Sequence, residues 1–233
     1  MDSPAAIAVN PKAVVTLRRI GREGHPLLVI DDVLVDADAL VETAAATAFG
    51  DPVAAYYPGL NAPMPRDYLL TLMPILRPSF ERAFGISRQI EMVASGFFAL
   101  STQPLENLGP LQKIPHYDQI SADSLAMVHY LAKDMGGGTG FFRHTATGFE
   151  AIDAARRETY LNRMADELET ADLSHFTGAR TPNYELLETA ELRFNRLIVY
   201  PSNVLHCALF DGARLDADPR TGRLTANSFF KPK

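Results

Sequence analysis

The first part of the chain alternates between stretches rich in β-branched residues and stretches whose apolar residues recur at helical spacing. Residues 13–20 and 26–35 are dominated by valine, isoleucine and leucine, and this composition predicts two strands. Residues 37–49 and 68–84 carry apolar side chains three or four positions apart, which predicts two helices. The stretch between these helices, 52–66, holds four prolines and a glycine and is expected to form a loop.

Two local signals concern the ends and the continuity of these helices. Asp36 precedes the first helix and is its predicted N-cap, because a carboxylate there accepts hydrogen bonds from backbone N–H groups that the first turn leaves free. Pro74 and Pro78 fall inside the second helix. Each proline removes a helical N–H donor, so we expect them to kink or divide this helix.

Short strand-like runs separated by Gly, Pro, Asn and Asp dominate the chain from residue 88 onward. This pattern predicts a β sandwich or barrel. A charged segment, 150–193, interrupts it, and residues 151–170 within that segment have helical spacing. We interpret the segment as an insertion that covers or flanks the β core, with an ordinary packing helix as the alternative. The expected strands are 89–100, 110–118, 124–132, 139–143, 195–200, 204–210 and 222–230.

The predicted fold class is therefore mainly β with flanking helices (α+β). We expect a single domain over 1–233, with an α/β N-terminal layer at 1–88 and the β core, including the helical insertion 150–193, at 89–233. Apolar residues make up 47% of the 233 residues and charged residues 21%, so the chain can bury a core without disulfides or structural metal.

Charge and cysteine content restrict the partners and the compartment. The formal net charge of −6 makes a nucleic-acid partner unlikely by composition. Cys207 is the only cysteine, so no internal disulfide can form, and a reducing compartment is the simplest interpretation. No apolar run approaches the ~20 residues that a membrane-spanning helix needs, and no signal-peptide pattern is visible. We therefore expect a cytoplasmic protein without a membrane partner.

A His-x-Asp pair is the first candidate for chemistry. His116 and Asp118 are two positions apart in a predicted strand, where side chains alternate between faces, so both should point the same way. An imidazole nitrogen and a carboxylate oxygen on one face could bind one metal ion. The alternative is a hydrogen-bonded surface pair, which arises often by chance.

His206 supplies the third possible ligand. It follows the apolar stretch 197–200 and a Pro-Ser-Asn turn, a position that suits the mouth of a β barrel. Two histidines and one carboxylate form the facial triad that binds non-haem Fe(II) and leaves three neighbouring coordination positions open.

An Arg-x-Thr pair opens the last predicted strand. Arg223 and Thr225 share a face, and the planar guanidinium of arginine matches a carboxylate. Arg214 and Arg220 compete for this role, but they lie in a polar stretch typical of a solvated loop. Tyr130, near the end of another predicted strand, is a fourth residue of interest.

In this order, these features resemble the iron- and 2-oxoglutarate-dependent dioxygenase superfamily, in its prolyl-hydroxylase-like branch. The resemblance covers roughly residues 26–230, and its specific motifs lie in 112–230. The motifs that carry it are His116-Tyr117-Asp118, Tyr130-Leu131, Gly137-Gly138-Thr139-Gly140-Phe141, Val199-Tyr200-Pro201 with His206, and Arg223-Leu224-Thr225.

The resemblance implies a double-stranded β-helix, a cupin-like jelly roll of two facing sheets. It further implies that His116, Asp118 and His206 ligate Fe(II), with 2-oxoglutarate as co-substrate and O2 as the other reactant. Arg223 would pair with the distal carboxylate of 2-oxoglutarate, and Tyr130 and Thr225 would hydrogen-bond to it.

Two spacings depart from the family pattern. The interval between His206 and Arg223 is longer than usual, which we attribute to a longer hairpin and which keeps Arg214 as the alternative anchor. The gap between Asp118 and His206 is also long, and the segment 150–193 would explain it.

The expected function is that of an Fe(II)/2-oxoglutarate-dependent oxygenase that hydroxylates an unactivated C–H bond of a small molecule or an amino-acid or peptidyl substrate, releasing succinate and CO2. Asp118 favours hydroxylation, because the related halogenases lack this carboxylate. The alternative is a non-enzymatic β-helix domain that binds a small acid or a protein partner. A cupin of other chemistry is disfavoured, since cupins usually carry His-x-His. The segments 52–66 and 150–193 are expected to shape specificity.

The other histidines have weaker signals. His144 could reach substrate or be a satisfied structural residue. His129 neighbours Tyr130 in sequence and should face away from the iron. His25 and His175 have no partner visible in the sequence.

Overall fold

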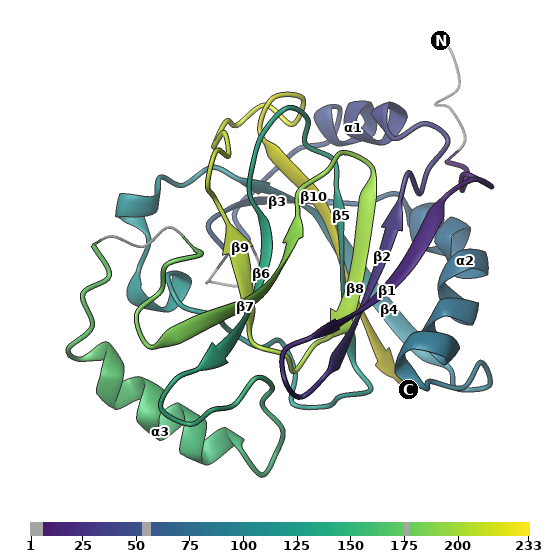
Figure 1. Ribbon diagram of the computed structural model, residues 1–233. Helices are drawn as coiled ribbons and strands as arrows, with labels where there is room; N and C mark the ends of the chain where they lie inside the picture. Colours follow the sequence, from purple (N-terminus) through teal and green to yellow (C-terminus); the bar gives the residue numbers. More distant parts are fainter. Residues whose placement is uncertain (1–6, 53–56, 175–177) are drawn as a thin grey trace.

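The computed structural model describes residues 7–52, 57–174 and 178–233 as two antiparallel β-sheets with three α-helices (Figure 1). The large sheet has seven strands in the order β1-β2-β8-β5-β10-β4-β3, and the small sheet has three in the order β7-β6-β9. The strands of the large sheet are β1 (Val14–Ile20), β2 (His25–Asp31), β3 (Gly59–Pro63), β4 (Met92–Ser101), β5 (Leu125–Tyr130), β8 (Arg196–Pro201) and β10 (Arg223–Pro232). Those of the small sheet are β6 (Gly138–His144), β7 (Tyr184–Glu191) and β9 (His206–Leu209).

From β4 onward the chain passes repeatedly between the two sheets. β4, β5, β8 and β10 belong to the large sheet, while β6, β7 and β9 belong to the small one. Between β4 and β5, His116 forms an isolated antiparallel bridge with His206 of β9, on the side of β9 that β6 does not occupy. The arrangement is a mainly antiparallel β sandwich of the jelly-roll kind, as the spacing of the short strands predicts.

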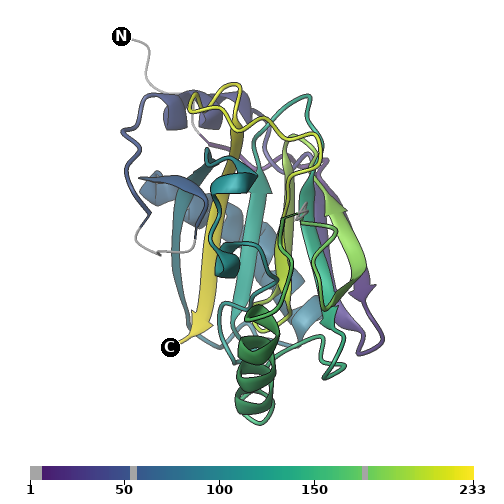
Figure 2. The ribbon, with the colours of Figure 1, turned by 90° about the vertical axis from the view of Figure 1, so that its left-hand side faces the viewer.

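Three apolar clusters separate the layers. The largest packs α1 (Asp38–Ala45) and α2 (Arg66–Phe84) against the outer face of the large sheet (Figure 1). A second cluster lies between the sheets and includes Tyr130, Phe141 and Tyr200. The third packs α3 (Arg157–Leu168) on the outer face of the small sheet, away from the large sheet (Figure 2). The interior between the sheets is therefore shielded on both sides.

The N-terminal elements extend the large sheet. β1 and β2 form in the two stretches predicted as strands. The N-cap of α1 is Ala37, one residue after the predicted Asp36, although Asp36 does accept a hydrogen bond from the Ala39 N–H at 3.0 Å. α2 runs unbroken through Pro74 and Pro78, so the expected division is wrong. Its buried stripe, which includes Leu72 and Leu76, holds it on the sheet despite the lost donors.

Three segments differ from the sequence prediction. β3 lies inside the expected loop 52–66, as an edge strand paired with β4. Residues 150–193 contain α3, as predicted, but also β7, which belongs to the small sheet. The predicted strand 110–118 is instead a 3-10 turn, Pro110–Gln112, followed by the single bridge at His116. Pro110 and Pro115 cannot donate hydrogen bonds to a β ladder, which explains the absence of a regular strand.

Within the described ranges no helix is long and apolar enough to cross a membrane.

A buried polar network under α2 contains His129. Asn195 uses its side-chain oxygen to accept a hydrogen bond from the Leu34 N–H at 3.0 Å, so the same oxygen accepts from His129 Nε2 at 3.2 Å. His129 Nδ1 then accepts from the Tyr68 hydroxyl at 2.8 Å. The imidazole is fully buried and neutral, and burial lowers the pKa of His129 to about 4. His129 is thus structural, as the sequence predicts.

This histidine should make the fold sensitive to acid. Between pH 6.5 and 4 the unfolded chain binds a proton at position 129 and the folded chain does not, so the free energy of unfolding falls as the pH falls. We expect the stability advantage of the wild type over His129→Gln to shrink by about 2 kcal/mol between pH 7 and pH 5. Urea unfolding of both proteins at each pH measures this, and a constant difference would contradict it.

Candidate functional site

Backbone hydrogen bonds join the two chain segments that carry the His-Asp-His residues. The His116 N–H donates to the His206 carbonyl at 2.9 Å, and the His206 N–H donates to the His116 carbonyl at 2.8 Å. The Asp118 N–H donates to the Ser202 carbonyl at 2.8 Å. These bonds hold the segment around His116 against the beginning of β9, which brings residues far apart in the sequence to one place.

The three side chains form a compact set of possible metal ligands. One ligand atom from each of His116, Asp118 and His206 lies within 4.8 Å of the others. Asp118 Oδ1 is 3.8 Å from His116 Nε2, and Asp118 Oδ2 is 3.6 Å from His206 Nε2. These separations are too long for hydrogen bonds, and Asp118 Oδ2 is buried without a hydrogen-bond partner.

The tautomer of His206 suits metal binding. Its Nδ1–H donates to the Val204 carbonyl at 2.9 Å, which leaves the lone pair on Nε2 directed to the cluster. Burial lowers the pKa of His206 to about 4, so the ring is neutral at physiological pH. Burial also raises the pKa of Asp118. A divalent cation would favour the ionised carboxylate, and the orphaned oxygen and two neutral imidazoles fit such an ion.

A buried arginine lies at the beginning of β10. Arg223 is 3% exposed, and its Nη2 donates to the Gly138 carbonyl of β6 at 2.9 Å, so the side chain spans the space between the sheets. Nη1 is 3.5 Å from Ser101 Oγ, and Nε has no hydrogen-bond partner. Among the described residues no carboxylate forms an ion pair with it. A buried guanidinium with a free donor and no counter-charge is costly unless an anion binds there.

Hydroxyl groups surround this arginine. Thr225 is buried on the same face of β10, and its Oγ1 donates to the Ala99 carbonyl at 3.4 Å. The Tyr57 hydroxyl is 3.1 Å from Ser101 Oγ, and burial raises the pKa of Tyr57. Tyr57 was not predicted as a site residue, because nothing in the Pro-rich stretch 52–66 indicates that this segment lies beside β4 in the folded chain.

Tyr130 faces the same interior but already has partners. Its hydroxyl lies 2.7 Å from Thr139 Oγ1 and donates to the Ala190 carbonyl at 3.2 Å. Burial raises the pKa of Tyr130 to about 12, so it stays protonated. In this geometry the Tyr130 hydroxyl therefore already hydrogen-bonds to two residues of the small sheet, Thr139 of β6 and Ala190 of β7.

The competing arginines lie at the surface. Arg214 is exposed and donates to the backbone carbonyls of Thr221 and Lys133, and Arg220 pairs with Glu42. Neither has the unsatisfied buried donor found in Arg223.

His144 lies behind the small sheet, outside the interior between the sheets. It is fully buried, with Nδ1 2.9 Å from Thr147 Oγ1 and Nε2 2.9 Å from Glu167 of α3. These partners satisfy both ring nitrogens, so the geometry favours a structural role. His25 pairs with Glu23 at 3.2 Å, and His175 lies outside the described residues.

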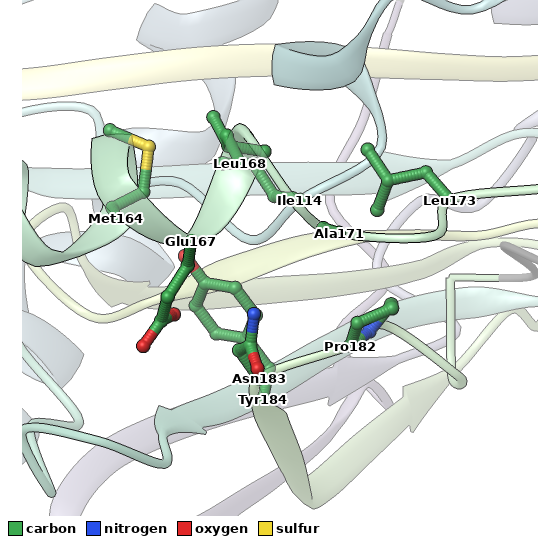
Figure 3. A pocket seen from close by; sticks show the side chains of 9 residues that line it. All are labelled: Ile114, Met164, Glu167, Leu168, Ala171, Leu173, Pro182, Asn183 and Tyr184. Carbon is green, nitrogen blue, oxygen red and sulfur yellow. The ribbon is translucent and has the colours of Figure 1, made fainter.

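A cavity under α3 is separate from the His-Asp-His cluster and from Arg223 (Figure 3). It is barely large enough for one water molecule. Its lining is Ile114, Met164, Glu167, Leu168, Ala171, Leu173, Pro182, Asn183 and Tyr184, and it includes neither the His-Asp-His cluster nor Arg223.

Comparison with known proteins gives a family. The family described as "Family of unknown function (DUF6445)" matches residues 11–230. The chain belongs to this family. The DUF6445 match spans both sheets, the His-Asp-His cluster and Arg223. No curated protein matches the chain.

Two solved structures resemble the DUF6445 chain weakly. HygX from Streptomyces hygroscopicus, with nickel, 2-oxoglutarate and hygromycin B bound, has a TM-score of 0.48 and 12% identity, over 89% of this chain and 83% of that one. An N-substituted L-amino acid dioxygenase from Burkholderia ambifaria has a TM-score of 0.41 and 10% identity, over 97% of this chain and 95% of that one. At such identities and TM-scores, neither likeness says what this chain does.

Proposed function

We propose that the chain is an Fe(II)/2-oxoglutarate-dependent oxygenase that hydroxylates a C–H bond of a small molecule or of an amino-acid or peptidyl substrate. One observation carries the proposal. The same interior holds a His-Asp-His cluster with a free carboxylate oxygen and a buried arginine with a free donor and no counter-charge. A cation at the first and a carboxylate at the second would satisfy both.

The roles of the metal ligands follow from their geometry. His206 would bind through Nε2, since its Nδ1–H is held by the Val204 carbonyl. Asp118 would supply a carboxylate oxygen, and His116 would complete one face of the coordination sphere. Three ligands on one face leave room for a chelating keto acid and for dioxygen. When bound, the ferrous ion supplies the oxidation of a C–H bond by O2, coupled to the conversion of 2-oxoglutarate to succinate and CO2.

The roles at the other end concern the distal carboxylate of 2-oxoglutarate. Arg223 would donate to it from Nε and from the Nη1 that contacts Ser101 only at 3.5 Å. Thr225 and Tyr57, whose hydroxyls lie near each other beside Ser101, would add hydroxyl contacts. Tyr130 would join them only if its hydroxyl left Thr139 or Ala190.

The strand order supports the finer fold that this function implies. A double-stranded β-helix has eight strands that alternate between two four-stranded sheets. Here β4, β5, β8 and β10 would form one sheet, and the segment at His116 with β6, β7 and β9 the other. The remaining strands, β1, β2 and β3, would extend the first sheet.

The main rival is a non-enzymatic domain that uses Arg223 to bind a small acid. It leaves the His-Asp-His cluster without a purpose, and it gives no reason for the orphaned carboxylate oxygen of Asp118. The oxygenase accounts for both ends of the interior.

A binding experiment tests the proposal without knowledge of the substrate. We expect the purified wild type to bind one Ni²⁺ as a redox-inert stand-in for Fe²⁺, and then one 2-oxoglutarate, with micromolar affinity in calorimetry. Iron, ascorbate and 2-oxoglutarate under air should then yield succinate. Absence of metal binding with both histidines intact would overturn the proposal, whereas 2-oxoglutarate binding that is equally strong without metal would favour the rival.

A further inference from the structure

One buried polar group in the interior has no role in the proposed function so far. The buried side-chain atoms without a hydrogen-bond partner among the described residues include Asp118 Oδ2, Arg223 Nε and Asn227 Oδ1. A metal ion would satisfy the first and a carboxylate the second. Ser202 Oγ and Asn203 Oδ1, in the turn before β9, also lack a partner, but on the strand that carries Arg223 and on the same face as Arg223, the side-chain carbonyl of Asn227 is the atom that remains.

Asn227 faces the same interior as the anion-binding arginine. It lies on β10, two and four residues beyond Thr225 and Arg223, so all three side chains share one face. Its neighbours across the strands are Val128 of β5 and Phe97 of β4.

The strand register places Asn227 between the two ends of the site. The next inward-facing residue of β10, Phe229, is opposite Ala126, and Ala126 is opposite Tyr200. The Tyr200 ring packs on His206 with 4.8 Å between ring centroids. Arg223 therefore marks one end of this face, the level of the metal cluster marks the other, and Asn227 lies between them.

The surroundings of Asn227 are apolar. Val128 and Phe229 pack on the cluster between the sheets, and the rings of Phe97 and Phe229 are 6.1 Å apart. A buried amide carbonyl beside such groups loses its hydration without gaining a protein partner. That arrangement destabilises the fold, unless a ligand supplies the missing donor.

We propose that Asn227 is a specificity-determining residue whose side-chain carbonyl accepts a hydrogen bond from the substrate to be oxidised. The inference rests on the proposed function. At neutral pH 2-oxoglutarate offers only acceptors, so it cannot satisfy this carbonyl. The donor must come from the other reactant, an N–H or O–H group next to an apolar part that contacts Phe97 and Phe229. The substrate class is thus an amine, amide or alcohol with an aliphatic or aromatic portion.

Asn227→Leu tests this inference, since leucine has the same branched shape and no polar group. We expect its melting temperature without ligands to rise by about 2 to 4 °C, because an unsatisfied carbonyl is removed. The affinity for 2-oxoglutarate, measured with Ni²⁺ present, should stay within about two-fold of the wild type. Ser228→Ala is the matched control, since Ser228 is the next residue and its unsatisfied hydroxyl faces the helices instead.

Turnover gives the third measurement. The probes are the proteinogenic amino acids with their N-methyl and N-acetyl derivatives, which place N–H donors beside apolar side chains. Any probe that accelerates succinate formation by the wild type should show kcat/KM at least about 10-fold lower with Asn227→Leu, mainly through KM, and unchanged with Ser228→Ala.

Three results would overturn the inference. A lower melting temperature for Asn227→Leu would mean that the amide stabilises the resting fold. Weaker 2-oxoglutarate binding by this variant would assign the amide to the co-substrate, and an unchanged kcat/KM would show that the substrate does not contact it. Failure of the wild type to bind Ni²⁺ is a different result, because it overturns the oxygenase itself.

Discussion

Replacing His116 by alanine is expected to weaken Ni²⁺ binding by more than about 100-fold and to abolish succinate formation. Loss of a residue that merely orients a metal ligand costs about 10- to 100-fold in affinity, and loss of a ligand should cost more. His116 is the best ligand to remove, because 54% of its side chain is exposed and its link to β9 is through backbone atoms. The fold should therefore tolerate the change, with a melting temperature close to that of the wild type. Calorimetry with Ni²⁺ and a succinate assay measure the two effects.

The matched control for this variant is His25→Ala. His25 is a partly buried histidine that pairs with Glu23, away from the cluster, so its removal should leave Ni²⁺ binding unchanged. Intact Ni²⁺ affinity in His116→Ala would contradict the metal site. The non-enzymatic alternative predicts that this variant binds 2-oxoglutarate as well as the wild type does.

Replacing Arg223 by methionine is expected to have opposite effects on affinity and on stability. The affinity for 2-oxoglutarate should fall at least about 100-fold, because a charge-assisted contact with the distal carboxylate is lost. Ni²⁺ binding without 2-oxoglutarate should be unchanged. The melting temperature without ligands should rise, because a buried charge without a counter-ion is replaced by a shorter, unbranched apolar chain. Calorimetry and thermal unfolding give both quantities.

Arg214→Met decides between the two arginines that the sequence leaves open. Arg214 is exposed and binds only backbone carbonyls, so its loss should leave 2-oxoglutarate affinity within about two-fold of the wild type. If Arg214→Met weakened 2-oxoglutarate binding and Arg223→Met did not, the assignment of Arg223 as the partner of the distal carboxylate would be wrong.

The sequence predicts well the strands whose side chains are buried. β5, β8 and β10 each appear within a few residues of their predicted limits, because continuous apolar or alternating runs indicate a buried strand directly. β3 and β7 are the strands it misses. β3 is a proline-bounded edge strand, and β7 is an edge strand of the small sheet in which half of the residues are polar. Edge strands bury little, so their sequences carry little of the pattern on which such predictions rest.

The candidate site, like the strands, could be predicted from the sequence only in part. His116 and Asp118 lie together as their spacing predicts, although the segment is not the regular strand that was expected. Their convergence with His206 depends on backbone hydrogen bonds between distant segments, which no local pattern encodes. Tyr57 and Asn227 stayed hidden for a related reason. Tyr57 is distinguished by its hydrogen bond to Ser101, and Asn227 by the lack of a hydrogen-bond partner for its side-chain oxygen. Both features depend on the folded chain and cannot be predicted from residues nearby in the sequence.

The contrast between the two ends of the site has a kinetic consequence for an oxygenase of this kind. Arg223 is almost wholly enclosed, whereas His116 is open to solvent. Entry on the side of His116 would bring a dicarboxylate to the cation before the guanidinium, and a molecule already seated near the cation would obstruct that route. The reactants would therefore load in a compulsory sequence, keto acid first and the compound to be oxidised second, with succinate released last.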